Sequence, residues 1–129
     1  MKCAVQLVFS ENDQTKINRL RNALAEKGVH DEAVPINHIS IADIEIDERQ
    51  LDSVAEVLDK FAKTHGKIKL ILGVMGTFMT SENVLFLAPT MTDELIQLND
   101  DMISDLKEIG VESGKYYIKN NPFHSLNVI

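Results

Sequence analysis

Two histidines lie inside short segments that favour β-strands, and each could present an imidazole to a ligand. His38 lies in the segment Asn37–Ile41, and His124 lies in the segment Phe123–Asn127. Alternate residues of a strand point to the same side, so His38 and Ser40 are predicted to share a face. If the two segments lie side by side, their imidazoles face one cleft and can act as a general base and a general acid near neutral pH.

The elements that would position these histidines alternate between strands and helices. Alternating apolar residues predict one strand over residues 3–9 and another from residue 36 to about residue 45. Apolar residues at helical spacing predict three helices, each with a polar residue at its start and a glycine at its end. The starts are Ser10, Asp47 and Thr90 or Thr92, and the ends are Gly28, Gly66 and Gly110.

The remaining apolar segments predict further strands. Residues 67–77 are predicted to form a long strand, and residues 83–88 are expected to be its hairpin partner. The tail is predicted to add one or two strands, over residues 116–118 and 123–128. This order of elements predicts an α+β or α/β fold, with helices packed on one side of a sheet. The order strand, helix, histidine-bearing strand occurs twice, which indicates two lobes that face each other across a central cleft.

The composition indicates one folded domain without a membrane segment. The chain has 129 residues, of which 44% are hydrophobic, and this length is enough for a single core. Its net charge of −7 argues against bulk binding to nucleic acid, because such affinity grows with the number of phosphates neutralised. Cys3 is the only cysteine, and no apolar run approaches the length of a membrane span or a secretory signal. We therefore expect a cytoplasmic protein.

The two histidine segments and the stretch between them resemble the 2H phosphoesterase superfamily, which includes 2′-5′ RNA ligase-like proteins and cyclic phosphodiesterases. That family carries two motifs of the form His-x-Ser/Thr followed by an apolar residue, each on a strand in one of two pseudo-symmetric lobes of antiparallel sheet. Residues His38–Ile41 match the first motif, and His124–Leu126 stand where the second is expected. Residues 72–78 and 84–89 resemble the family's connection between the motifs, so the resemblance spans essentially the whole chain.

Two features depart from the family pattern. Leu126 replaces the hydroxyl residue of the second motif, and a leucine side chain cannot donate a hydrogen bond to phosphate. Ser125 points to the other side in a regular strand, although a bulge would turn it toward the ligand. The sequence ends at Ile129, whereas family members usually continue beyond the second motif. The single domain over residues 1–129 is therefore expected to have a minimal second lobe, or one that is incomplete or completed by another subunit.

The resemblance implies a metal-independent phosphodiesterase that needs no cofactor and hydrolyses a 2′,3′-cyclic phosphate on a small nucleotide or an RNA end. His38 and His124 would be the acid–base pair, while Ser40 and Ser125 would bind the phosphate. The alternative is a catalytically silent relative that binds a phosphorylated ligand or a protein partner through the same cleft, which Leu126 favours. The sequence leaves the natural substrate and the oligomeric state open, a homo-oligomer included.

Other polar residues have secondary or structural explanations. Lys115, Tyr116 and Lys119 precede the second motif and could hold a phosphate and stack a base, or could equally form a solvated edge strand. Gly73–Thr77 lacks the Gly-Lys-Ser/Thr ending of a phosphate-binding loop, and a strand bend explains it better. The chain has no His-x-His, no His-Glu-x-x-His and no pair of cysteines, so a catalytic metal is not expected.

Four further ionisable residues are expected to lie outside the site. Asp43 and Glu45 lie on the face opposite His38 if the second strand is regular. His30 is predicted to lie in a loop and His65 at the end of a helix, and both are expected to be solvent-exposed. The position of His65 suits the negative end of its helix dipole.

Overall fold

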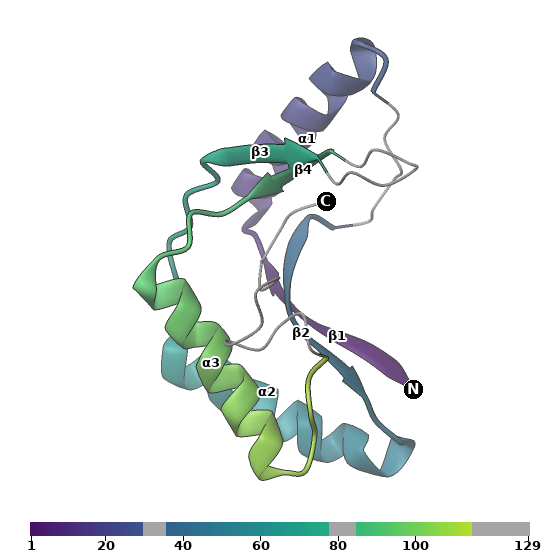
Figure 1. The fold of residues 1–129 in the computed structure, drawn as a ribbon, viewed down its shortest axis with the longest axis vertical. Helices are drawn as coiled ribbons and strands as arrows, with labels where there is room; N and C mark the ends of the chain where they lie inside the picture. Colours follow the sequence, from purple (N-terminus) through teal and green to yellow (C-terminus); the bar gives the residue numbers. More distant parts are fainter. Residues whose placement is uncertain (30–35, 78–84, 115–129) are drawn as a thin grey trace.

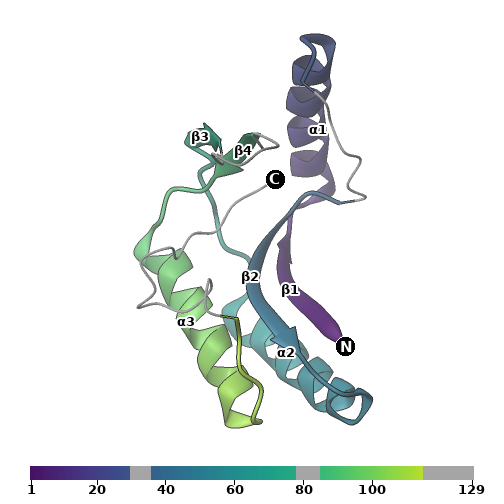
Figure 2. The same cartoon turned by 45° about the vertical axis from the view of Figure 1, so that its right-hand side comes forward.

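The computed structural model describes residues 1–29, 36–77 and 85–114 of the chain (Figure 1). Strand β1 (Lys2–Val8) and strand β2 (His38–Glu45) pair antiparallel in a long, twisted, two-stranded sheet. Helix α1 (Glu11–Glu26) continues from the end of β1 and extends away from the other helices in both views of the ribbon (Figures 1 and 2). The histidine-bearing strand β2 therefore begins at the base of a projecting helix.

Helix α1 begins and ends where the sequence predicts. The Ser10 hydroxyl accepts a hydrogen bond from the Asp13 amide and so caps the first turn. Gly28 follows the last turn with a φ of 91°, a left-handed conformation that glycine adopts without strain. Ile17 is the buried residue of this helix. Because α1 buries so little apolar surface, polar contacts with the start of β2 are important in holding it.

Helices α2 (Leu51–His65) and α3 (Asp93–Glu108) pack against each other on the same face of the β1–β2 sheet (Figure 2). A short 3₁₀ helix, Glu48–Gln50, leads into α2. Asp47 caps this 3₁₀ helix and Thr92 caps α3, so both predicted helix starts are confirmed.

The hydrophobic core lies between the β1–β2 sheet and these two helices. Its members are apolar residues on the inner face of the sheet, apolar residues of α2 and α3 at helical spacing, and the residues that follow β2 and α3 closely. They are Val5, Ile39, Ile41, Ala42, Ile44, Ile46, Val54, Phe61, Leu95, Leu98, Met102, Leu106 and Val111.

Strand β3 (Val74–Thr77) and strand β4 (Leu85–Ala88) form a second antiparallel pair, so the predicted hairpin partners are confirmed. The predicted strand over residues 67–77 is shorter in the structure, because residues 67–73 have no strand beside them among the described residues. Their alternation nevertheless reflects one-sided packing. The residues that pack against the core from this segment are Ile68, Leu70 and Leu72, and the residues between them are exposed.

The described part of the chain thus confirms an α+β fold with antiparallel strand pairs and three α-helices. The strand pairs β1–β2 and β3–β4 belong to separate sheets. The predicted tail strands over residues 116–118 and 123–128 lie outside the described residues. Among the residues that the structure describes, no helix combines the length and the apolar character needed to cross a bilayer.

Candidate active site

His38 and Ser40 lie on the outer face of the β1–β2 sheet, away from the helices that cover the inner face. Both side chains are half-buried, while Ile39 between them is fully buried in the core. Across the sheet His38 pairs with Val8 and Ser40 pairs with Gln6. The prediction that the imidazole and the hydroxyl share one face is therefore confirmed by the burial pattern of β2.

The imidazole of His38 is held by its own backbone. Its Nδ1 lies 2.8 Å from the carbonyl oxygen of Ile36. A carbonyl oxygen only accepts hydrogen bonds, so Nδ1 must carry the proton that forms this contact. In the neutral ring the other nitrogen, Nε2, is then the unprotonated one. This is the arrangement by which proteins fix a histidine tautomer and leave one nitrogen ready to accept a proton.

Asn37, immediately before His38, fixes the start of β2 against α1. Its side chain is buried, with 3% of its surface exposed. Its backbone amide and side-chain amide both donate to Gln14, and its carbonyl accepts from the same residue, all at 2.8–2.9 Å. The side-chain Nδ2 also donates to Asn18, and Oδ1 accepts from Arg21. Because every polar group of Asn37 is engaged, the backbone that carries the His38 ring is held in one position.

An extra residue in β2 changes which side chains lie beside His38. Val5 pairs with Ala42 but Gln6 pairs with Ser40, so Ile41 has no partner residue in β1. Ile41 and Ala42 are consecutive, and both are buried. Such a bulge reverses the alternation of faces beyond it.

The prediction that Asp43 and Glu45 lie on the face opposite His38 is therefore wrong. That prediction assumed a regular strand, but the bulge makes the strand irregular between His38 and Asp43. Both carboxylates are exposed on the same outer face as His38 and Ser40, whereas Ile44 between them is buried. The outer face of β2 thus carries an imidazole and a hydroxyl at one end and two carboxylates at the other.

The far edge of β2 receives the segment that leads into the tail. Ile44 and Ser113 form an antiparallel bridge, and the Gly114 amide donates to the Asp43 carbonyl at 2.7 Å. The Asp43 amide in turn donates to the Ser113 hydroxyl at 3.2 Å. The chain after α3 therefore meets the same strand that carries His38, on the edge that β1 leaves free.

The other predicted site residues lie outside the described residues. They are Lys115, Tyr116, Lys119, His124 and Ser125, together with Leu126 of the second motif and His30. The structure brings together His38 and Ser40 and leaves the pairing of the two imidazoles as a prediction.

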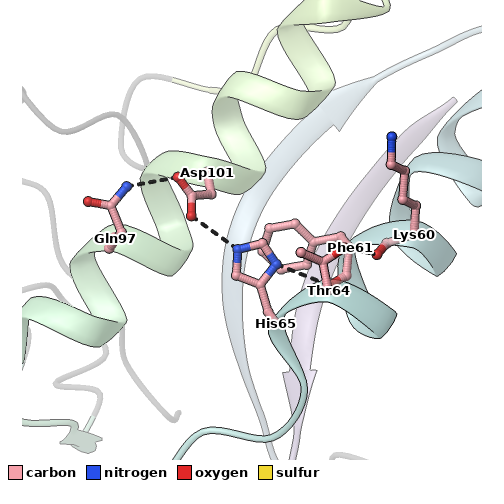
Figure 3. A network of polar contacts seen from close by, with 6 residues as sticks. All are labelled: Lys60, Phe61, Thr64, His65, Gln97 and Asp101. Atoms are coloured by element: carbon pink, nitrogen blue, oxygen red, sulfur yellow. Dashed lines mark hydrogen bonds and ion pairs between the residues drawn. The ribbon is translucent and has the colours of Figure 1, made fainter.

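A second histidine has a defined environment that the sequence did not predict (Figure 3). The ring of His65, at the end of α2, stacks on the ring of Phe61 with 3.9 Å between ring centroids. Its Nδ1 lies 3.1 Å from the Phe61 carbonyl oxygen, and its Nε2 lies 3.0 Å from Asp101 Oδ2 on α3. The expectation that His65 is solvent-exposed is wrong, since only 24% of its side-chain surface is accessible.

The partners of His65 favour its charged form. A carbonyl and a carboxylate both accept, so both ring nitrogens donate when the ring is an imidazolium. The hydrogen bond to Asp101 raises the pKa of His65 above 6.5, an effect that burial opposes in part. The hydrogen bonds from His65 and Gln97 lower the pKa of Asp101 below 3.8. With both nitrogens engaged in hydrogen bonds, His65 connects α2 to α3.

Sequence signals for these contacts exist in part. Phe61 and His65 are four residues apart, the spacing at which side chains meet on one face of a helix. Asn37 shows no such pattern, because its partners on α1 are remote in sequence.

Among the described residues, no three His, Cys, Asp or Glu side chains converge as a metal site would require. No protein-family model, curated protein or solved structure matches the chain.

Proposed function

We propose that this protein is a phosphodiesterase that hydrolyses 2′,3′-cyclic phosphate on a nucleotide or an RNA end, with His38 and His124 as its acid–base pair. The single observation that carries the proposal is the state of the His38 ring. Its Nδ1 is bound to the Ile36 carbonyl, so its Nε2 is the nitrogen that can accept a proton. Ser40 on the same face supplies a hydroxyl donor.

The proposed reaction needs two proton transfers at one phosphorus centre. Nε2 of His38 takes a proton from water as the water oxygen bonds to phosphorus. The bond from phosphorus to the 2′ or 3′ oxygen breaks, and the imidazolium of His124 donates its proton to that oxygen. Ser40 donates a hydrogen bond to a nonbridging oxygen, where negative charge is held in the transition state. Two imidazoles suffice for both transfers, so the proposed reaction is metal-independent.

The path of the chain is compatible with a second histidine at this site. Gly114 is hydrogen-bonded to Asp43 at the edge of β2 opposite β1. The chain from Gly114 to His124 is twice as long as the stretch of β2 from Asp43 to His38. If extended, it can therefore reach His38, because residues advance by similar distances in extended chains. The two-lobed architecture with a central cleft remains part of this proposal.

The test is turnover of 2′,3′-cyclic nucleotides in the presence of EDTA. Each of the variants His38→Asn and His124→Asn is expected to lower kcat by about 10²–10⁴-fold, the usual effect of one general acid or base. Ser40→Ala is expected to lower kcat by about 10²–10³-fold, as for loss of one oxyanion donor. Ser53→Ala is the matched control, because Ser53 is an exposed serine on α2. Parental turnover in both histidine variants would show that the assignment is wrong.

A second candidate function rests on Leu126. Without a hydroxyl in the second motif, the phosphate loses one donor, and the protein would bind a phosphorylated ligand without cleaving it. This candidate predicts that the parental protein shows no turnover with EDTA or with added divalent cations. A 2′,3′-cyclic nucleotide would still shift the NMR signals of His38 and Ser40, and His38→Asn would abolish that binding.

A further inference from the structure

The bulge in β2 has a polar partner in the helix layer. Asn99 of α3 donates a hydrogen bond from Nδ2 to the carbonyl oxygen of Ile41 at 2.7 Å. Ile41 is the extra residue of the strand and has no partner residue in β1. Asn99 is fully buried, with 0% of its surface exposed. The buried carboxamide of Asn99 is therefore hydrogen-bonded to the residue of β2 that interrupts the pairing with β1.

Asn99 occupies a position that helical spacing assigns to the core. Leu95 precedes it by four residues and Met102 follows it by three, and both are buried. A polar side chain on this face has to satisfy its polar atoms inside the protein. Nδ2 of Asn99 donates to the Ile41 carbonyl, but Oδ1 is buried with no hydrogen-bond partner among the described residues. Asn99 therefore satisfies the carbonyl oxygen of Ile41 but leaves its own Oδ1 without a donor in the part of the chain that the structure describes. The hydrogen bond then adds little to the free energy of unfolding. The effect of Asn99 must then lie in which strand conformation it favours.

The hydrophobic pattern of β2 requires an extra residue but does not fix where it lies. Ile39 must face the core on one side of the irregularity, and Ile44 must face it on the other. Ser40, Ile41 or Ala42 could each be the residue without a partner. If Ser40 were the extra residue, its hydroxyl would no longer pair with Gln6 on the outer face. The site of the bulge therefore decides the direction of the Ser40 side chain.

We infer that Asn99 is a positioning residue, whose hydrogen bond places the bulge at Ile41 and thereby holds the Ser40 hydroxyl beside His38. The inference about the strand stands on the described contacts alone. Its consequence for turnover rests on the phosphodiesterase function proposed above.

The test compares Asn99→Leu with Leu98→Ala. The leucine has a similar size and removes the donor, while Leu98→Ala truncates a neighbouring buried residue of α3 whose side chain has no hydrogen-bond donor to lose. Backbone NMR and amide hydrogen exchange report the state of Gln6, Ser40 and Ile41. In Asn99→Leu we expect exchange at the bulge to rise at least about tenfold more than in Leu98→Ala, with line broadening at Gln6 and Ser40. Identical spectra and exchange around the bulge in both variants would overturn the inference.

Turnover gives an independent readout. Misplacing one phosphate donor is expected to lower kcat of Asn99→Leu by about 10–100-fold with KM changed by less than about twofold, after correction for the folded fraction. Asn99→Gln keeps the carboxamide and should restore part of kcat, and it serves as the second variant if Asn99→Leu does not fold. Parental kcat in Asn99→Leu would overturn the catalytic consequence. If the parental protein has no turnover, the proposed function fails while the NMR comparison still decides the role of Asn99.

Discussion

Replacing Asp101 by asparagine removes the negative charge that faces His65 and keeps the size of the side chain. In the parental protein the Asp101 carboxylate accepts from His65 Nε2 at 3.0 Å and from Gln97 at 2.8 Å. The two ionised side chains are partly accessible, at 24% for His65 and 38% for Asp101, so water weakens their attraction. We therefore expect a loss of about 0.5–1 kcal/mol in the free energy of unfolding, within the range of solvent-screened ion pairs.

The pH dependence follows from the direction of the two pKa shifts. The folded protein raises the pKa of His65, so the contribution of that residue is complete below about 6.5 and is lost as pH rises through the raised value. It lowers the pKa of Asp101, so that contribution is present above about 3.8 and is lost as pH falls through the lowered value. Both side chains are charged between these limits, and the effect of Asp101→Asn should be largest near pH 5.5.

Thermal unfolding at two pH values measures this effect. At pH 5.5 the Tm of Asp101→Asn should fall by about 2–4 °C, the shift that this energy produces in a domain of this size. At pH 9 the fall in Tm should be clearly smaller, because a neutral His65 no longer attracts the carboxylate while the hydrogen bond from Gln97 remains. An NMR titration should show the pKa of His65 lower in the variant, and less so in Asp105→Asn, because Asp105 acts on His65 only through space. An equal loss of Tm at both pH values would refute the reasoning.

Two other substitutions test the supports of the sheets. Asn37→Ala should lower the free energy of unfolding by about 1–3 kcal/mol, because Gln14, Asn18 and Arg21 lose contacts with the buried carboxamide. Urea unfolding measures this loss, and a loss no larger than that of the exposed variant Asn22→Ala would contradict the prediction. Gly76→Ala should disrupt the β3–β4 pair, because a Cβ at residue 76 would lie 2.7 Å from the Phe86 ring. Amide exchange in β3 and β4 should then rise while exchange in β1 and β2 stays parental; protection of β3 and β4 as in the parental protein would show that the ring simply moves.

The helices could be predicted from the sequence because their signals are local. Ser10 and Thr92 cap helix starts through hydrogen bonds to residues three positions ahead. Gly28 and Gly110 follow the ends of α1 and α3 with positive φ, which the sequence marks directly. The contacts of Asn37 and His65 join elements that are far apart in the chain, so no local pattern predicts their partners.

The bulge is an intermediate case, and its cause can be worked out from burial. In a regular strand with Ile39 and Ile41 inward, Asp43 and Glu45 would also face the core, where an unpaired carboxylate is very costly. With Ile44 and Ile46 inward instead, His38 and Ser40 would be buried and Ile39 exposed. Neither regular alternation buries all the apolar residues of the strand and exposes all the polar ones. One extra residue achieves both, because it places Ile41 and Ala42 on the same side.

The adjacent apolar residues Ile41 and Ala42 are therefore the sign in the sequence that the inward-facing positions change along the strand. The prediction of a regular strand overlooked this sign. The pattern implies that an irregularity must exist somewhere between Ile39 and Ile44, but burial alone is satisfied by more than one location. A contact from outside the strand has to choose among them, and Asn99 supplies the side-chain hydrogen bond at Ile41. The orientation of Ser40 is thus set by two separate causes: the cost of burying carboxylates demands a bulge, and a directional hydrogen bond from α3 locates it.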